Sequence, residues 1–328
     1  MEAGRSEAMR FALMIEPQQG MSYADQLAVA RHAEAAGFEA LFRSDHYESF
    51  PGPADRPTTD AWAVIAGLAR ETTKIGLGVL VSPVTYRLPG NLAKLIATVD
   101  EMSGGRLEVG LGAGWHEEEH RRYGFPFPPI EERATMLGEQ VAIVAGLLHG
   151  TDGFSFSGRY YTVEDARVRP RPTRRINILI GGEGSPRSMR IAAAHAGEFN
   201  LSSASPERAL EKFAQLDATC RAAGRDPATL RRSAMVGTLI GRDDSEVQRR
   251  IGELVTLLAG DDDGPGDAGS DAWLAERRKR WIIGTPEQAR ARIRQYANAG
   301  CERLMLQDFL PWDLEMIDLM GAELVGRA

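Results

Sequence analysis

The sequence places an acidic residue and a histidine side by side directly after a short apolar run. The run Glu39–Phe42 is typical of a buried strand, and the tetrapeptide RSDH (43–46) follows it. At the end of a strand, His46 can donate a proton or hydrogen-bond a carbonyl, and Asp45 can orient it or face a cofactor. The alternative interpretation is that Asp45 caps a helix and His46 is a surface residue.

A second candidate site is a glycine-rich turn that leads into a helix. The turn follows the strand pattern at 176–180 and precedes a helix that begins near Pro186. Free N–H groups at a helix N-terminus favour an anion, so the turn predicts a phosphate site, to which Arg187 could add a contact. The residues expected to bind the phosphate are Gly181, Gly182, Glu183, Gly184 and Ser185. A simple capped turn, with Ser185 as N-cap, is compatible with the same residues.

Glycines also alternate along another apolar run. Gly110, Gly112 and Gly114 leave part of this segment without side chains, so a flat ring can approach the backbone closely. Glycines in strands serve tight barrel packing as well, and both interpretations stay open. Ser82-Pro83, after another strand pattern, predicts an extended or turning backbone.

These candidates can meet only if the strands before them are parallel neighbours. Short apolar runs alternate with longer amphipathic runs through most of the chain, which predicts parallel pairing. An open doubly wound sheet and a closed barrel both fit, but about eight strands and no G-x-G-x-x-G after the first strand favour a (β/α)8 TIM barrel.

The predicted strands are 10–15, 39–42, 75–80, 107–111, 176–180, 198–201, 234–240 and 303–306. The predicted helices are 23–36, 60–70, 91–102, 131–148, 186–196, 206–223, 244–259, 286–299 and one from about 314, with a hairpin at 154–163.

Two segments interrupt the alternation. Residues 115–129 are aromatic and proline-rich and follow the fourth predicted strand, so a barrel places them at the active-site mouth. Residues 260–270, in an insertion near residues 260–280, cannot bury apolar surface and predict a mobile loop. Residues 1–9 predict a disordered leader, which leaves 10–328 as a single barrel domain.

Composition argues against several other classes of protein. The net charge of −7 disfavours a nucleic-acid partner, and no stretch is long and apolar enough to span a membrane. Cys220 and Cys301 are far apart and predict free thiols in a reducing, cytoplasmic compartment. His116 and His120 have helical i, i+4 spacing, but the glycines that flank them argue against a long helix, so no metal site is expected.

The order and spacing of five stretches together resemble the bacterial luciferase-like monooxygenase superfamily, in particular its branch that depends on the deazaflavin coenzyme F420. The stretches are RSDHY (43–47), LVSPVTYRLPGNLAK (80–94), SGGRLEVGLGAGWHEEEHRRYGFPFP (103–128), FSGRYY (156–161) and ILIGGEGSPRSMRIAA (178–193). The resemblance runs from about residue 10 to beyond 303. It implies a TIM barrel with an insertion after the fourth strand.

The resemblance also implies roles for individual residues. It predicts a bulged third strand with a non-prolyl cis peptide behind the isoalloxazine ring, within Val79–Val81 and by alignment at Val79-Leu80. The pair Asp45-His46 matches the residues at the ring face, with His46 as proton donor. The implied cofactor contacts outside the glycine-rich turn are Asp45, Val79, Leu80, Val81, Ser82, Gly112, Ala113 and Gly114. The implied substrate contacts are Trp115, His116, Tyr123 and Phe125.

One position departs from the pattern that the resemblance implies. Some deazaflavin dehydrogenases carry a glutamate acid directly after the glycine strand, whereas here Trp115 stands there and His116 and Glu117 follow. The departure argues against a sugar-phosphate dehydrogenase of that kind.

The leading hypothesis is an oxidoreductase that moves a hydride between C5 of coenzyme F420 and an organic substrate, which the aromatic insertion suggests is hydrophobic. A monooxygenase that uses flavin mononucleotide (FMN) from a separate reductase is the second hypothesis. A flavin-binding protein without turnover is the third, because a barrel does not fix a function. A homodimer is expected from the resemblance. A group of five arginines favours F420, because its tail is polyanionic, although such residues usually lie in a solvated loop. These arginines are residues 167, 169, 171, 174 and 175.

Overall fold

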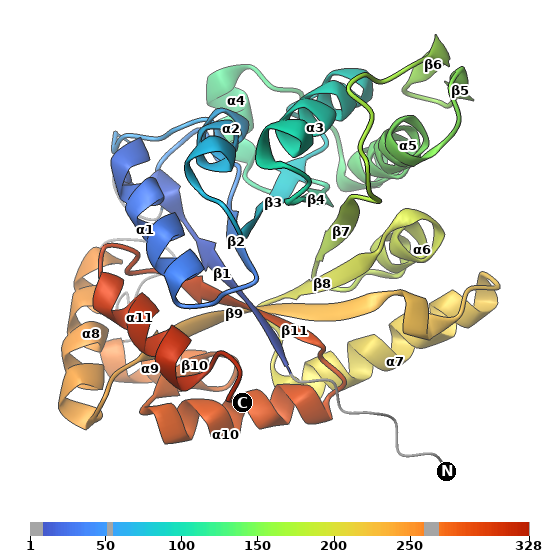
Figure 1. Cartoon of the computed structure of the whole chain (residues 1–328). Helices are drawn as coiled ribbons and strands as arrows, with labels where there is room; N and C mark the ends of the chain where they lie inside the picture. The colour runs from blue at the N-terminus through green and yellow to red at the C-terminus, as the bar shows by residue number, and fades with distance from the viewer. Residues whose placement is uncertain (1–8, 51–54, 259–268, 328) are drawn as a thin grey trace.

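A computed structural model describes residues 9–50, 55–258 and 269–327 (Figure 1). The barrel strands are β1 (Arg10–Ile15), β2 (Ala40–Arg43), β3 (Gly76–Pro83), β4 (Leu107–Gly112), β7 (Asn177–Gly182), β8 (Glu198–Ser202), β9 (Arg231–Ile240) and β11 (Arg303–Asp308). In the described chain these eight strands are all parallel to their neighbours, and the pairing of β8 with β9 closes the sheet. The predicted TIM barrel is therefore confirmed.

Helices follow the strands and cover the outside of the barrel (Figure 1). The predicted helices are all present: α1 (Tyr23–Ala35), α2 (Ala61–Glu71), α3 (Pro89–Ser103), α5 (Ile130–His149), α6 (Pro186–His195), α7 (Pro206–Ala222), α8 (Asp244–Leu257), α10 (Pro286–Asn298) and α11 (Leu314–Glu323). The predicted hairpin is also present and consists of β5 (Phe154–Ser157) and β6 (Thr162–Ala166). The structure has in addition two short 3-10 turns, η1 (Pro17–Gln19) and η2 (Pro227–Thr229). In the described part of the chain no helix is both long and apolar enough to cross a bilayer.

The core has two parts because barrel strands are buried on both faces. Most buried apolar side chains lie between the strands and the surrounding helices. A smaller cluster fills the barrel interior, with Met14, Phe42, Leu80 and Met305 among its members. Because both faces of each strand are buried, the strand sequences are continuous apolar runs.

Three elements of the structure do not follow from the sequence pattern. They are α4 (Glu117–Tyr123), α9 (Gly269–Arg278) and the short strand β10 (Ile282–Gly284). Gly114 and Gly124 have φ angles of +78° and +71° and bound α4 on either side, so the glycines limit its length without preventing it. Of the predicted loop at 260–270, residues 260–268 lie outside the described residues, and 269–270 begin α9. Residues 1–8 of the predicted leader also lie outside them.

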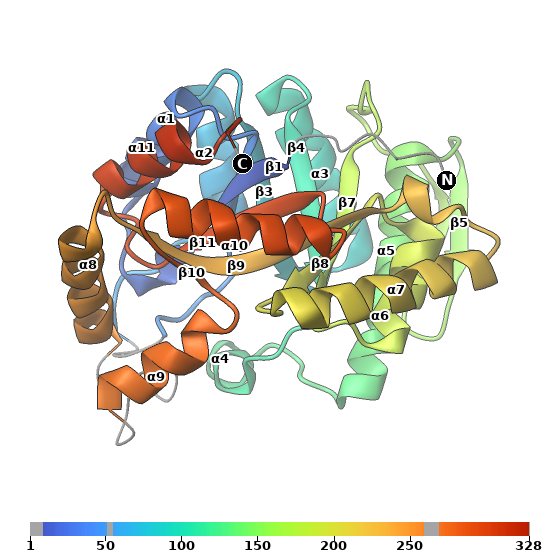
Figure 2. The same ribbon diagram turned by 90° about the horizontal axis from the view of Figure 1, so that it is seen from below.

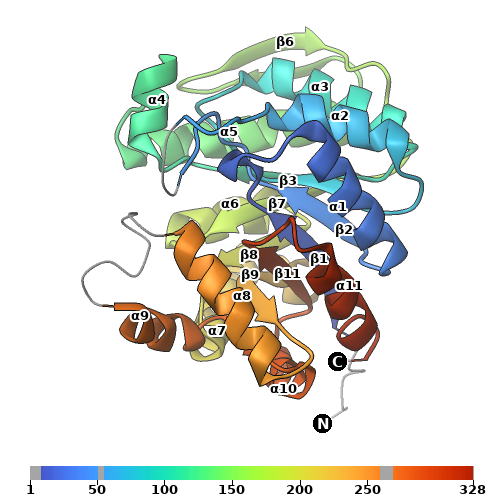
Figure 3. The same ribbon diagram turned by 90° about the vertical axis from the view of Figure 1, so that its left-hand side faces the viewer.

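Figures 2 and 3 place α4 and α9 on the same side of the barrel. Since α4 follows closely on the C-terminal end of β4, this side is the mouth at which active sites of such barrels form. Cys220 and Cys301 are both buried free thiols, as the sequence predicts. Burial raises the pKa of Cys301 to about 12, so this thiol stays protonated.

The opposite, N-terminal face carries a cluster of paired charges. Arg303, the first residue of β11, is fully buried and contacts Glu39, Glu108 and Glu198. Its guanidinium lies 2.8 Å and 2.9 Å from the two oxygens of Glu108. Burial alone would raise the pKa of Glu108, but Arg303 and Asn177 outweigh it and lower this pKa to about 2. Glu108 therefore stays ionised.

Candidate active site

The sequence-predicted residues lie at the ends of strands that neighbour one another in the barrel. β2, β3, β4 and β7 are adjacent in that order, and each is parallel to the next. The segments that follow them therefore meet at the mouth, which brings Asp45-His46, Ser82, the segment after Gly112 and the turn at Gly182 to one side of the molecule.

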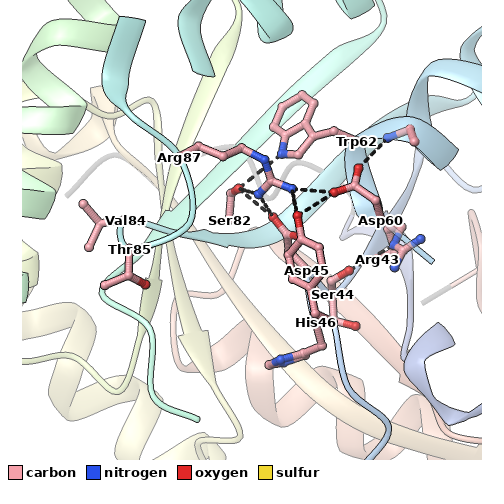
Figure 4. A network of polar contacts seen from close by, with 12 residues as sticks. Arg43, Ser44, Asp45, His46, Asp60, Trp62, Ser82, Val84, Thr85 and Arg87 are labelled. Carbon is pink, nitrogen blue, oxygen red and sulfur yellow. Dashed lines mark hydrogen bonds and ion pairs between the residues drawn. The ribbon is translucent and has the colours of Figure 1, made fainter. Parts of the chain in front are cut away.

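Asp45 lies in a network of protein donors below the mouth (Figure 4). It is 1% exposed, accepts a hydrogen bond of 2.7 Å from the hydroxyl of Ser82 and forms an ion pair with Arg87. Arg87 also binds Asp60 at 2.9 Å and the hydroxyl of Tyr47 at 3.1 Å. Both oxygens of Asp45 are thus held by the protein. In this arrangement Asp45 anchors the segment after β2, and its contact with a cofactor stays a prediction.

His46 turns away from the Arg87 network (Figure 4) and pairs with a carboxylate from α4. Nδ1 of His46 lies 2.9 Å from Oε2 of Glu119, whose side chain is fully buried. The other oxygen of Glu119 accepts hydrogen bonds from the backbone N–H groups of Tyr47 and Glu48. Glu119 therefore holds the whole turn that carries His46.

The charge of Glu119 determines how His46 is protonated. Burial alone would raise the pKa of Glu119, but the hydrogen bonds from His46 and from the Tyr47 N–H outweigh it, and the pKa lies below its ordinary value. An ionised carboxylate only accepts hydrogen bonds, so Nδ1 of His46 must carry a proton. Neutral His46 then presents the lone pair of Nε2, and protonated His46 presents an N–H. This is the arrangement of a general acid–base histidine positioned by a carboxylate.

Aromatic side chains surround the His46 ring. The ring centroids of Phe50, Trp115 and His116 lie 4.4, 5.9 and 6.4 Å from that of His46. Trp115 is 62% exposed, a large value for so apolar a side chain, and it contacts Phe50 at 5.4 Å. Burial lowers the pKa of His116, which keeps this second ring neutral. The wall beside His46 is thus apolar and partly open to solvent.

The other two residues predicted to contact substrate lie further along the insertion. Tyr123 donates a hydrogen bond of 2.7 Å to the carbonyl oxygen of Tyr47. Phe125 packs between Tyr47 and Tyr86, with ring centroids 5.3 and 4.6 Å away. Both therefore support the turn that carries His46, and their contact with substrate stays a prediction.

His120 takes no part in a metal site. Its Nδ1 contacts the carbonyl oxygen of His116 at 2.7 Å, and its Nε2 contacts the hydroxyl of Thr85 at 2.7 Å. Both ring nitrogens are used inside the protein, so the i, i+4 spacing of the two histidines serves helix packing.

The bulge of β3 lies where the resemblance implies it, with one correction. Pairing of β3 with β4 is regular up to Val79 and resumes at Ser82, so two residues stand out of register. The cis peptide is Leu80-Val81, inside the predicted segment but one bond later than the predicted Val79-Leu80 bond. Val79 still pairs regularly with β4, which places the irregular peptide after it.

The alternating glycines make room for this bulge. A Cβ on Gly110 would lie 2.5 Å from the carbonyl oxygen of Val79, and one on Gly112 would lie 2.5 Å from a methyl of Val81. A Cβ on Gly181 of β7 would meet Val81 from the other side at 2.7 Å. Real Cβ atoms do not approach so closely, so packing of the bulge explains these three glycines. Val81 itself is partly exposed in the barrel interior.

The turn after β7 combines open space with a helix N-terminus. Gly182 has a φ of +152°, and a Cβ added there would meet no atom within 4 Å. Ser185 caps α6 by accepting a hydrogen bond of 3.1 Å from the N–H of Ser188. The turn therefore fits a phosphate: it has room, and the positive end of α6 points to it. Arg187 does not join it, because its side chain binds the Glu131 carbonyl oxygen and Thr135 on α5.

The hypothesis that the arginines at 167–175 contact a cofactor tail is wrong. They precede β7, whereas the turn predicted to bind phosphate follows it. Arg169 and Arg171 bind Asp152, and Arg174 binds the carbonyl oxygen of Leu107. The six residues of β7 span about 20 Å, so the two segments lie at opposite ends of the barrel.

Sequence analysis missed three residues of this site: Arg87, Glu119 and Phe50. Arg87 had a signal, since it is the one charged residue between Ser82 and Gly90. Glu119 is the third of three consecutive glutamates, and only the position of α4 shows which of them turns inward. Phe50 borders a segment without a clear pattern.

Together, the barrel, the bulged strand, the histidine at the mouth and the open glycine turn before α6 are the features that the resemblance to luciferase-like oxidoreductases implies. The chain matches the luciferase-like monooxygenase family over residues 8–303, and it belongs to this family. It is 28% identical over 307 residues to the F420-dependent glucose-6-phosphate dehydrogenase of Microbacterium testaceum (strain StLB037). The alignment covers 90% of each chain. It is 28% identical over 209 residues to pyrimidine monooxygenase RutA of Allorhizobium ampelinum (strain ATCC BAA-846 / DSM 112012 / S4), covering 61% of this chain and 56% of the relative.

Solved structures show the same fold. An F420-dependent secondary alcohol dehydrogenase in complex with an F420-acetone adduct superposes with a TM-score of 0.81 at 20% identity, over 97% of this chain and 99% of the other. EDTA monooxygenase (EmoA) from Chelativorans sp. BNC1 also gives a TM-score of 0.81, at 18% identity, over 97% and 93%. The protein is thus a luciferase-like oxidoreductase whose relatives use F420 or FMN.

Proposed function

We propose that the protein is an F420-dependent oxidoreductase in which His46 exchanges the proton that accompanies hydride transfer. The observation that carries the proposal is the pairing of His46 with buried Glu119 at the barrel mouth. Bound F420 would supply a carbon that accepts or gives a hydride. A substrate that changes between alcohol and carbonyl also exchanges a proton, and Nε2 of His46 is the group at the mouth suited to this exchange.

The residues at the bulge and the turn would hold the cofactor. The partly exposed Val81 and the surrounding glycines offer a flat apolar surface for the ring. Gly182 and the N-terminus of α6 would receive the phosphate. Trp115 and Phe50 would exclude water around the reacting atoms, which strengthens the hydrogen bonds there.

Similarity to F420-dependent relatives supports the choice of F420. The F420-dependent dehydrogenase from M. testaceum aligns over nine-tenths of both chains. The absence of a glutamate directly after the glycine strand argues against a sugar phosphate as substrate. However, Glu119 brings a carboxylate to His46 from four residues beyond Trp115. The apolar wall favours a hydrophobic alcohol or carbonyl compound.

Titration of the apo-protein with F420 and with FMN, followed by fluorescence, tests the cofactor. Tight F420 binding with weak FMN binding supports the proposal. A panel of alcohols and carbonyl compounds would then be screened as substrates. The reverse result would favour the FMN-dependent monooxygenase, which needs a separate reductase and consumes oxygen. Binding of neither would contradict the assignment of the turn at Gly182.

The state of assembly and the presence of turnover need separate tests. We expect the homodimer that is common in this class of protein, which light scattering checks. A variant His46→Ala that binds the cofactor normally but loses turnover would exclude a purely binding role. Cofactor binding without turnover across the whole substrate panel would favour that role.

A further inference from the structure

The N-terminal face of the barrel carries a cavity that the proposed function does not use. It has a volume of about 430 Å³ and is lined by the first residues of several strands, among them Arg10, Gly76, Asn177 and Arg231. The segment before β7 and the C-terminal ends of α5 and α6 form its rim. Its volume lies within the range of pockets that bind small organic molecules.

Basic side chains dominate the lining of this cavity. Two acidic residues line it, Glu39 and Glu108, and both are engaged: Glu39 with Arg10 and Arg303, and Glu108 with Arg303. The six basic residues are Arg10, Lys74, Arg106, Arg174, Arg175 and Arg231. The excess of positive charge is unexpected in a chain whose net charge is −7.

Several hydrogen-bond donors of the cavity have no acceptor. Within the described residues, the side chains of Lys74 and Arg175 make no hydrogen bond or ion pair. Both ring nitrogens of His149 are buried, also without a partner. Burial and the charge of Arg175 lower the pKa of His149 to about 4, so the neutral ring keeps one N–H to donate. Lys74 and Arg175 are exposed and hydrated, but a buried imidazole without a partner costs free energy, and a ligand that accepts a hydrogen bond from His149 would relieve this cost.

We infer that this cavity binds a small organic phosphate, held by Lys74, Arg175 and His149. A phosphate matches the fixed donors of a guanidinium and the point charge of an ammonium group. The cavity is larger than a bare phosphate needs, which leaves room for an organic group of modest size. Ligand binding here would join the starts of β3 and β7 to the end of α5.

The site is independent of the proposed cofactor site. The cavity begins at Asn177, the first residue of β7, and the proposed cofactor phosphate lies beyond Gly182, the last. About 20 Å of strand separates the two. A ligand in the cavity would therefore leave the mouth free, and failure of one proposal does not affect the other.

Calorimetric titration of the full-length protein with inorganic pyrophosphate at constant ionic strength tests the inference. Wild-type protein is expected to bind, and Lys74→Ala/Arg175→Ala to bind at least about tenfold more weakly, because two charged donors are lost. Both residues are exposed, so the variant should fold. A matched control is Arg208→Ala/Arg294→Ala, which removes two exposed charges elsewhere and should bind within about twofold of wild type.

Gly182→Ala identifies which end of the barrel is responsible. This variant strains the cofactor turn and should bind pyrophosphate as wild type does. Loss of binding in Gly182→Ala, with normal binding in Lys74→Ala/Arg175→Ala, would place the anion at the cofactor turn and overturn the inference. So would absence of binding to wild type at about 10 mM pyrophosphate.

Discussion

Carboxylates are buried at both ends of the barrel, but with different partners. At the N-terminal end, Glu39, Glu108 and Glu198 all contact Arg303, and Glu39 and Glu198 also pair with Arg10 and Arg231. At the mouth, Glu119 holds a histidine whose second ring nitrogen has no such partner among the described residues. The first arrangement pairs carboxylates with arginines, and the second leaves one imidazole nitrogen available to react.

Asp308 sharpens the contrast between the two ends. It lies at the mouth end of β11, is fully buried, and one of its carboxylate oxygens has no hydrogen-bond partner. Burial raises its pKa to about 7. The N-terminal cluster thus pairs its carboxylates with arginines, whereas the mouth end of β11 buries a carboxyl group with one oxygen unpaired.

The largest expected effect concerns His46. His46→Ala should lower turnover by about 10²- to 10⁴-fold, because general acid–base groups contribute rate factors of this size. Steady-state kinetics with the first substrate found, followed by F420 absorbance, measures the loss. Glu119→Gln should keep the cofactor dissociation constant and lower kcat, with the Nδ1–H form of His46 lost in ¹⁵N spectra. His32→Ala, an exposed histidine on α1, is the control. Unchanged turnover in both active-site variants would remove the proposed role of the pair.

Arg303→Met should destabilise the protein by about 3–5 kcal/mol, since it removes a fully buried guanidinium and leaves Glu108 without its ion-pair partner. Urea unfolding measures the loss. Arg31→Met breaks an exposed pair with Glu71 and should cost at most about 1 kcal/mol. Equal effects of the two variants would mean that the N-terminal cluster does not stabilise the fold.

Arg87→Met should cost less than Arg303→Met, about 1–3 kcal/mol, because Asp60 is 36% exposed and can be hydrated, and buried Asp45 keeps its hydrogen bond from Ser82. The same unfolding experiment compares the two ends directly. Greater hydrogen exchange in the turn after β2 should accompany the change, since Arg87 anchors Asp45. A larger loss than that of Arg303→Met would reverse the comparison.

Asp308 gives a prediction with a defined pH dependence. Between about pH 4 and pH 7, folded Asp308 keeps a proton that the unfolded chain has lost, so stability should fall as pH rises through this window and level off above it. Asp308→Asn removes this loss and should therefore stabilise the protein more at pH 8 than at pH 4. Thermal unfolding at both pH values checks it. Equal effects at both would show that Asp308 is ionised throughout.

Local sequence signals account for most of the fold. Each barrel strand begins and ends within about three residues of its predicted position, because apolar runs and the glycine or proline residues beside them are properties of neighbouring residues. α4 was missed because it is one short helix between two glycines, and β10 because it has only three residues.

The site was predictable only in part. Asp45-His46 and the turn at Gly182 stand directly after strands, where a barrel places functional residues. The pairing of His46 with Glu119 joins positions 73 residues apart and depends on how α4 sits, which no local pattern encodes. The separation of the arginines at 167–175 from the turn at Gly182 is predictable from the sequence. Residues before a parallel strand lie at the opposite end of the barrel from residues after it.

A single insertion serves both parts of the proposed reaction. The segment after β4 carries Trp115, which is predicted to contact substrate, and four residues later Glu119, which fixes His46. A change in this segment that admits a new substrate will therefore also disturb the proton-transfer group. During divergence, or in laboratory evolution of this enzyme, gains in substrate range should come paired with losses in rate, unless the substitutions fall on Phe50 and leave α4 intact.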